Sequence, residues 1–280
     1  MSQAIAVCHG EFGRAALYRL DKSIIKHAHR EGHLIFYVDG ADAQVPNGDV
    51  VCKLDINQAV AVSPWEPHAF DTSEGAETIC LVLYIKPIWF LENSQSAEFA
   101  LRFGDCVLKV TDEVLELVRR LTALLLENEE QNTFDGLLFS LTKACFDQSW
   151  LNDKSGQRSG SYNRFSDFRV RRSLRLIQKR MGEDFEMERL ARSVGLSRPH
   201  FFKLFKQYMG VTPNVYINTL RSERAIDELL NTEKTVTDIA FDLGFSSQAS
   251  FTRFFSSNVG IAPSEYRRVA HVTSGAFPMM

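Results

Sequence analysis

The chain has 280 residues, of which 45% are hydrophobic and 24% charged, and its net charge is −3. This composition is typical of a globular protein in water, and no apolar run reaches the roughly eighteen residues that a membrane-spanning helix needs. The length is sufficient for two ordinary domains, and the first ten residues lack a secretory pattern, so we expect a cytoplasmic protein.

The charge is unevenly distributed along the chain. Residues 168–270 contain 17 Lys and Arg against 11 Asp and Glu, whereas residues 1–167 contain 15 against 24. A local basic surface attracts a polyanion, and an acidic region repels one. The carboxy-terminal part is therefore the candidate for binding nucleic acid, although a solvated basic face explains the charge equally well.

The five cysteines are scattered along the chain and never form a C-x-x-C pair. In the cytoplasm we expect them to be reduced, and we interpret them as small core residues. A redox-sensing thiol would need a basic and partly exposed setting, which the sequence does not show. The cysteines are Cys8, Cys52, Cys80, Cys106 and Cys145.

The first part of the chain, up to about Pro87, predicts short β-strands. Apolar runs such as Leu34–Val38 and Val60–Val62 are each followed by turn residues. This alternation is typical of an all-β sandwich or barrel.

Two amphipathic helices follow the predicted strands. From Val114 to Leu125 apolar residues recur every three or four positions, with Thr111 as the helix cap. A second such helix runs from about Phe134 to Trp150. They form a helical hairpin, about 111–150, that either covers the strands or pairs with a second copy of the chain.

A segment rich in glycine and serine, 154–161, has too few apolar residues to pack and is interpreted as a linker. The predicted organisation is an amino-terminal domain at 1–152, a linker at 153–166, a second domain at 167–270 and a tail at 271–280.

The second domain contains an internal repeat. The pattern recurs at an offset of 49 residues before the turn and of 50 after it, because the second turn has one more residue. Its first copy consists of Leu190, Ala191, Val194, Gly195, Ser197, Phe201, Phe205, Gly210, Pro213 and Tyr216. A small alanine allows close helix contact, a glycine ends the first helix and a polar residue caps the second. Each copy therefore predicts a helix-turn-helix unit, whose second helix can lie in the DNA major groove.

One long helix is expected to join the two units. Thr212 caps it, Pro213 occupies its first turn, and apolar positions continue to Leu230. Roughly eighteen residues at about 1.5 Å each give a rod of about 27 Å, close to the ~34 Å repeat of B-DNA. The two reading helices can thus enter successive major grooves on one face of a duplex.

Residues from about Phe168 to Arg268 resemble the DNA-binding domain of the AraC/XylS family of bacterial transcription regulators. The resemblance rests on Leu190–Ser197, Leu204–Lys206, Asp238–Ser247, Phe251, Phe254, Phe255, Gly260 and Pro263–Arg267. It implies a sequence-specific DNA-binding protein, and favours a transcription activator that acts as a homodimer with RNA polymerase as a partner. No enzymatic activity, membrane partner or cofactor is expected.

Helical periodicity separates buried from DNA-facing positions in the two reading helices. Phe201, Leu204 and Phe205 are expected to be buried, as are Phe251, Phe254 and Phe255. The positions expected to face DNA are Arg198, Pro199, Phe202, Lys203, Lys206, Gln248, Ala249, Thr252 and Arg253.

The chemistry of the outward side chains favours base reading by the second unit. Arg253 suits a guanine edge, Gln248 an adenine, and the methyl groups of Thr252 and Ala249 a thymine. Arg198, Lys203 and Lys206 suit bases or phosphates equally. Phe202 departs from the small or polar residue expected there, so it either stacks on a thymine methyl or a sugar, or turns inward.

The histidines of the first domain resemble those of the cupin barrel, whose metal-binding members carry H-x-H, a nearby carboxylate and a distant histidine. His27 and His29 at i and i+2 on a strand would share one face, but His33 stands where a glutamate is usual. Three roles stay open: a divalent metal held by His27, His29 and His68, the polar lining of an effector pocket, or a structural role. The predicted pocket residues are His27, His29, His33, Phe36, Trp65, His68 and Phe70.

The predicted fold is α+β with two domains: a cupin-like β-barrel with a helical hairpin, and an all-α domain with two helix-turn-helix units. The favoured function is transcription regulation controlled by a small-molecule effector in the barrel. One alternative is a metal-dependent cupin enzyme fused to a DNA-binding domain, which a stoichiometric metal ion would support. Another is a constitutive DNA-binding protein with a dimerising barrel, for which no metabolite changes the melting temperature.

Overall fold

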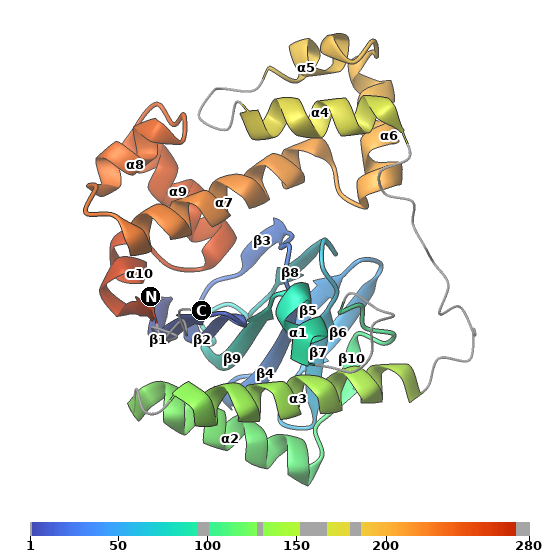
Figure 1. Ribbon diagram of the computed structural model, residues 1–280. Coiled ribbons are helices and arrows are strands. Elements are labelled where there is room, and N and C mark those ends of the chain that lie inside the picture. Colours follow the sequence, from blue (N-terminus) through green and yellow to red (C-terminus); the bar gives the residue numbers. More distant parts are fainter. Residues whose placement is uncertain (1, 94–100, 128–130, 152–166, 180–185, 273–280) are drawn as a thin grey trace, which may run out of the picture.

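The computed structural model describes residues 2–93, 101–127, 131–151, 167–179 and 186–272. The predicted linker at 153–166 and most of the predicted tail at 271–280 lie outside these ranges. Strands form the amino-terminal region and helices the carboxy-terminal region, so the fold class is confirmed. Figure 1 shows the long helix α7 spanning between two groups of helices on one side of the strands.

The amino-terminal strands are arranged in two sheets. One has the order β10-β7-β4-β9-β2-β1-β11 and the other β3-β8-β5-β6, and all their pairings are antiparallel except that of β1 with β11. The strands are β1 Gln3–Gly10, β2 Gly13–Leu20, β3 Ile24–His27, β4 Gly32–Gly40, β5 Ala43–Asn47, β6 Val50–Leu54, β7 Gln58–Val62, β8 His68–Phe70, β9 Thr78–Ile85, β10 Val107–Lys109 and β11 Ala270–Val272.

Alternation along the strands produces two separate cores. In β4, Ile35 packs with the residues between the sheets, whereas Leu34 and Phe36 point to the opposite face. That opposite face is covered by the hairpin of α2 (Asp112–Glu127) and α3 (Gln131–Leu151), with the short α1 (Pro87–Asn93) beside it. Of the two roles predicted for the hairpin, the structure shows the first.

Capping threonines mark where two of the helices begin. The amide of Val114 donates to the Thr111 hydroxyl at 3.3 Å, and that of Val215 donates to the Thr212 hydroxyl at 3.3 Å. None of the helices in the described ranges is long and apolar enough to cross a membrane.

The internal repeat appears as two similar helix-turn-helix units. The glycine after each reading helix, Gly210 or Gly260, adopts φ 76° or 93°, and the glycine in each turn, Gly195 or Gly244, adopts φ 76° or 79°. The joining helix α7 has 19 residues. The helices are α4 Phe168–Lys179, α5 Met187–Ser193, α6 Arg198–Met209, α7 Pro213–Asn231, α8 Val236–Asp242, α9 Gln248–Val259 and α10 Pro263–Val269.

The chain returns to the amino-terminal sheet after α10. Strand β11 pairs in parallel with β1, with Val7 opposite Ala270 and His9 opposite Val272. No pattern in the sequence predicts this strand, because three residues are too few to establish a period. The pairing attaches the second helix-turn-helix unit to the amino-terminal region by backbone hydrogen bonds.

Gly195 and Gly260 allow a matched test of the contact between the second helix-turn-helix unit and the amino-terminal strands. Alanine at Gly195 should cost about 1–2 kcal/mol, because an L residue resists positive φ while the space around its Cβ is open. Alanine at Gly260 should lower the melting temperature further, since its Cβ would lie 3.0 Å from Ile24 Cδ1 and 3.3 Å from Leu20 Cδ2. Equal falls in melting temperature for G195A and G260A would contradict this expectation, because they would show that the strand side chains make room for the added Cβ at no cost.

Candidate nucleic-acid interface and ligand cavity

The predicted DNA-facing residues all lie on accessible sides of α6 and α9. Phe202 and Thr252 are half-buried, and the remaining seven are exposed: Arg198, Pro199, Lys203, Lys206, Gln248, Ala249 and Arg253. The residues expected inside are buried, with Phe254 partly so. Contact of these side chains with DNA stays a prediction.

Phe202 is turned partly inward. It packs against the core that contains Phe201, at a ring distance of 6.2 Å, and the Arg198 guanidinium lies 5.5 Å from its ring centre. The inward alternative of the two predicted orientations therefore describes Phe202 better, and its exposed edge is what remains for a nucleic acid.

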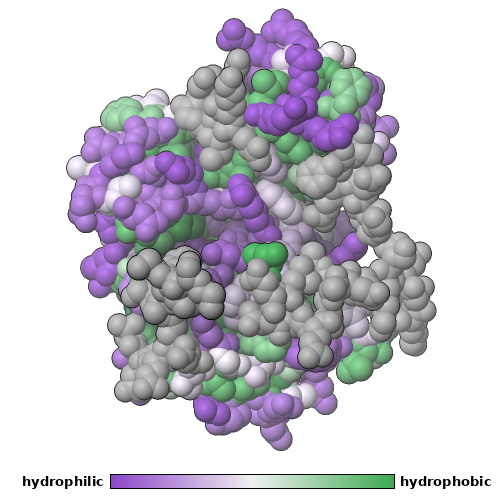
Figure 2. Space-filling model, in the orientation of Figure 1, coloured by the Kyte–Doolittle hydropathy of each residue, from purple (hydrophilic) through white to green (hydrophobic). Residues whose placement is uncertain are grey.

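Some of the candidate reading side chains already have partners within their own unit. Arg198 forms an ion pair with Glu188 at 2.8 Å, and the Gln248 side-chain oxygen accepts from Thr237 at 2.8 Å. Exposed ion pairs contribute about 1 kcal/mol or less, so DNA can displace them at small cost. Figure 2 shows that hydrophilic side chains predominate over α8 on the face in view.

The first contact between the two regions is a stack of aromatic rings. Tyr216, at the start of α7, lies parallel to Trp65 at a centroid distance of 4.9 Å and an angle of 19°, and its edge meets Phe205 at 5.5 Å. Trp65 adopts φ 65°, which is rare for a residue with a side chain, and its amide donates to the His29 carbonyl at 2.7 Å.

The second contact uses the equivalent tyrosine of the other repeat. The buried Tyr266 hydroxyl accepts from Arg14 at 3.1 Å and is 2.8 Å from His9 Nε2, and its ring meets Phe255 at 5.6 Å. Arg14 also lies 3.7 Å above the Tyr84 ring. Both copies of the repeated tyrosine thus pack against the amino-terminal region.

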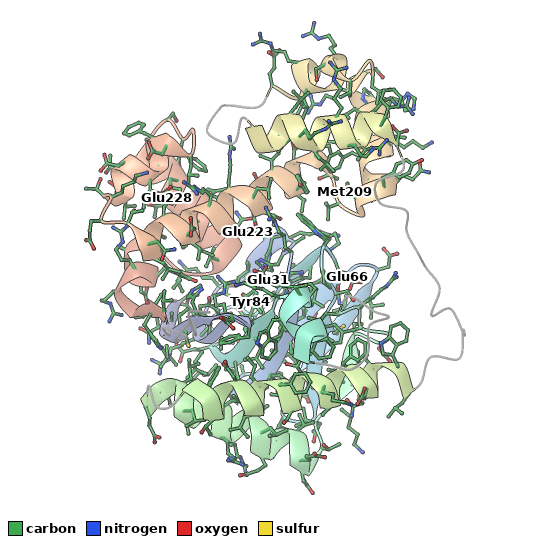
Figure 3. The ribbon with its side chains drawn as sticks, viewed as in Figure 1. Glu31, Glu66, Tyr84, Met209, Glu223 and Glu228 are labelled. Atoms are coloured by element: carbon green, nitrogen blue, oxygen red, sulfur yellow. The ribbon has the colours of Figure 1, made fainter. Side chains whose placement is uncertain are left out.

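Further polar contacts lie along α7. The Thr219 hydroxyl donates to the Ala28 carbonyl at 2.9 Å, and Glu223 pairs with Arg30 at 2.8 Å. Figure 3 shows Glu223 directed from α7 toward the strands. Burial raises the pKa of Glu223 to about 8, and the Arg30 charge opposes this rise.

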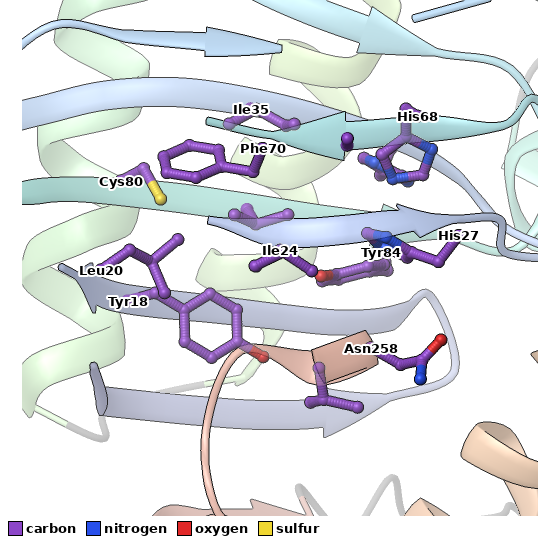
Figure 4. Close-up of a pocket in the computed structure, with 14 residues that line it drawn as sticks. Tyr18, Leu20, Ile24, His27, Ile35, His68, Phe70, Cys80, Tyr84 and Asn258 are labelled. Carbon is purple, nitrogen blue, oxygen red and sulfur yellow. The ribbon is translucent and has the colours of Figure 1, made fainter. Parts of the chain in front are cut away.

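A small cavity lies between the sheets and the end of α9. The cavity is small: the centre of a water-sized sphere can move through about 30 Å³. Figure 4 shows Asn258 of α9 beside the strand residues that form the other walls. The lining consists of Tyr18, Leu20, Ile24, His27, His33, Ile35, His68, Ala69, Phe70, Cys80, Val82, Tyr84, Asn258 and Val259.

The predicted pocket is brought together only in part. His27, His33, His68 and Phe70 line the cavity. His29 is not among the lining residues, but its ring lies 5.5 Å from that of His68. The structure corrects the other two predicted residues. Phe36 is three positions from His33, so strand alternation turns it toward the hairpin, and Trp65 is held outside by Tyr216.

Sequence reasoning missed several cavity residues. Tyr18 and Leu20, like Cys80, Val82 and Tyr84, occur at a spacing of two, and this period was available as a signal. Asn258 and Val259 had none, because they come from the other region of the chain.

Burial disfavours the charged form of His27, His29, His33 and His68. Burial lowers the pKa of His27 to about 4, and burial also lowers the pKa values of His29, His33 and His68 well below the usual range. The three predicted metal candidates, His27, His29 and His68, have ligand atoms within 4.8 Å of one another.

Comparison with known proteins supports the interpretation of the helices. A family model described as a helix-turn-helix domain matches residues 190–269. An uncharacterized HTH-type transcriptional regulator of Staphylococcus aureus strain COL is 37% identical over 102 residues, which are 36% of this chain and 14% of that protein. The regulatory protein PocR of Salmonella typhimurium is 32% identical over 102 residues, which are 36% of this chain and 34% of that protein. The match thus spans at most about a third of these relatives.

Solved structures show the same overall fold. An apo variant of ToxT from Vibrio cholerae matches with a TM-score of 0.57 and 13% identity, over 91% of this chain and 97% of that one. Wild-type ToxT with a bound unsaturated fatty acid matches with a TM-score of 0.54 and 16% identity, over 91% and 94%. At these identities the likeness establishes the fold alone.

The contact between His9 and Tyr266 predicts acid sensitivity. Burial, assisted by the Arg14 charge, lowers the pKa of folded His9 to about 3, whereas the unfolded chain binds this proton below about 6.5. Acidification therefore favours unfolding in this range. The melting temperature should fall less steeply for H9Q than for the unchanged chain between about pH 7 and pH 5. Parallel profiles would show that His9 does not contribute.

Proposed function

We propose that this chain, whose residues 190–269 match a helix-turn-helix family model, is a regulator of the AraC type that binds specific DNA sequences with α6 and α9. The duplicated helix-turn-helix carries this proposal: two reading helices with buried phenylalanines and accessible polar residues are joined by one uninterrupted helix. The relatives are named as regulators, so we propose regulation and no catalysis.

Control by a small molecule is the second part of the proposal. The cavity combines apolar walls with buried polar groups, which is the lining that small ligands need. ToxT, which shares the fold, has been solved with an unsaturated fatty acid bound, and this supports a small-molecule ligand for this chain as well.

The size of the cavity suggests how a ligand would act. A cavity of about 30 Å³ is far smaller than the roughly 150 Å³ cavity that holds benzene, so a metabolite must displace neighbouring groups. Asn258 and Val259 are the lining residues that belong to the DNA-binding region. A ligand that moves these two residues also shifts α9. If the ligand binds more tightly to one position of α9 than to the other, it changes the affinity for DNA.

Activation, dimerisation and contact with RNA polymerase follow from the family resemblance alone. We include them in the proposal because regulators of this family generally act in this way. Dimerisation is testable by the mass of the chain in solution.

The direct test is to sequence the genomic fragments that the purified full-length chain retains. The proposal expects one shared motif in two segments about 10–10.5 base pairs apart, centre to centre. Retained fragments with no shared motif would contradict sequence-specific binding. The genes beside the retained fragments would then indicate the pathway.

Base reading and phosphate contact can be separated by two substitutions. R253A should cost roughly 1–3 kcal/mol and relax the preference at one base pair, because an arginine that recognises a guanine edge is lost. K206A should weaken specific and random DNA alike. K143A, on the remote helix α3, is the matched control and should change neither affinity. Equal losses on specific and random DNA for R253A would remove Arg253 from the base-reading residues.

Ligand control can be tested at the cavity wall. A metabolite that raises the melting temperature should lose this effect in V82F, because the larger ring fills the free space. The melting temperature of the unliganded variant checks its folding. A metabolite that stabilises both proteins equally binds elsewhere, and a screen in which no metabolite acts would favour the constitutive alternative.

A further inference from the structure

Histidine rings cluster at one wall of the cavity. The His27 ring lies 4.8 Å from that of His29 and 4.4 Å from that of His68, and the His29 and His68 rings are 5.5 Å apart. His33 stands beside them, 4.4 Å from His68 and 5.2 Å from His29. The cluster therefore contains four of the seven histidines of the chain.

Backbone carbonyls orient two of these rings. His27 Nδ1 is 2.7 Å from the Ile25 carbonyl, and His68 Nδ1 is 2.9 Å from the Glu66 carbonyl. A carbonyl only accepts hydrogen bonds, so each Nδ1 carries the proton and each Nε2 of a neutral ring keeps its lone pair. Histidines that ligate a metal are commonly held in this way by a hydrogen bond from the other nitrogen.

The other two rings have nitrogens without a partner. His29 Nε2 and His33 Nδ1 are both buried, and neither forms a hydrogen bond within the described part of the chain. An unsatisfied buried polar atom costs about 1–3 kcal/mol, and a bound ion or water is a common explanation for such an atom.

We propose that His27, His29 and His68 bind one divalent transition-metal ion, with His33 beside the fourth coordination position. Imidazoles whose nitrogens lie about 2.0–2.1 Å from one ion, at angles of about 90–110°, have ring centres about 4.5–5.2 Å apart. The observed centroid distances of 4.4, 4.8 and 5.5 Å bracket this range. The ligand atoms lie within 4.8 Å of one another, and they would move closer together to meet on one ion.

The ligand set selects the kind of ion. Imidazole nitrogens suit Zn²⁺, Ni²⁺, Cu²⁺ and Fe²⁺, whereas Mg²⁺ and Ca²⁺ require oxygen ligands. All ligand groups in the cluster found among the described residues are histidines. Among these ions Zn²⁺ is the appropriate probe, because it is not redox-active and readily accepts three histidines with an open fourth position.

The position of the site connects it to the DNA-binding region. The His29 carbonyl accepts from the Trp65 amide, and Trp65 carries the ring on which Tyr216 stacks. Ala28 lies between His27 and His29 in the sequence, and its carbonyl accepts a hydrogen bond from the Thr219 hydroxyl of α7. A bound ion would fix this segment and hence the surface on which α7 docks. This consequence rests on the proposed function, whereas metal binding itself does not.

The test uses the full-length chain without a histidine tag, stripped with a chelator and then dialysed against Zn²⁺. We expect about one equivalent of zinc by elemental analysis and a rise in the melting temperature relative to the stripped protein. Co²⁺ should replace zinc and produce the visible absorption of a low-coordinate site. A loaded chain that retains no more than a trace of metal would overturn the proposal.

Matched variants assign the ion to the cluster. H68Q and H29Q should each abolish the stoichiometric zinc and the thermal shift, and H29Q is the milder change because His29 is only half-buried. A chain in which histidines outside the cluster are replaced, H200Q with H271Q, should retain both. Zinc retained by H29Q and H68Q but lost from the double variant would place the ion elsewhere and refute the site.

The connection to DNA binding has a separate readout. Zinc should change the affinity of the unchanged chain for a retained genomic fragment at least severalfold, and should not do so for H29Q. Zinc binding with unchanged DNA affinity would refute the connection and leave the site standing. A chain that binds zinc but no specific DNA would refute the proposed function and leave the metal site standing.

Discussion

Each helix-turn-helix unit packs a tyrosine from the same position of the repeat against the amino-terminal region, and these two contacts hold the parts of the chain together. Tyr216 stacks on Trp65, and Tyr266 meets Arg14 and His9 through its hydroxyl. Each tyrosine also contacts the last buried phenylalanine of its own reading helix. The residues that close each helix-turn-helix core thus also form the contact with the strands, so a change in that contact reaches both DNA-reading units.

Helix α9 connects the DNA-facing surface with the cavity. The accessible residues Gln248 and Arg253 lie in its first two turns, whereas Asn258 and Val259 at its other end line the cavity. Twelve residues make a rod of about 18 Å, which is too short to bend appreciably. A ligand that tilts the end at the cavity therefore tilts the reading end as well. The pairing of β11 with β1 limits this movement, because it attaches the chain just after α10.

Local patterns in the sequence predicted most of the fold but only part of the cavity. Glycine, proline and the periodic phenylalanines specify the helix-turn-helix units, because their effects act within a few residues. Phe36 lies on the face opposite His33 because an odd number of positions separates them along β4, so strand alternation excludes Phe36 from the cavity. Asn258 and β11 depend on tertiary packing between the regions, which no short stretch of sequence encodes.

If α7 holds the two reading helices at the spacing of successive major grooves, each bound chain should cover two turns of the duplex. Hydroxyl-radical footprinting of the full-length chain on a retained genomic fragment measures this arrangement. Two protected segments should appear on one face of the duplex, centred about 10–10.5 base pairs apart for each bound chain. A single protected segment, or two segments on opposite faces, would contradict it.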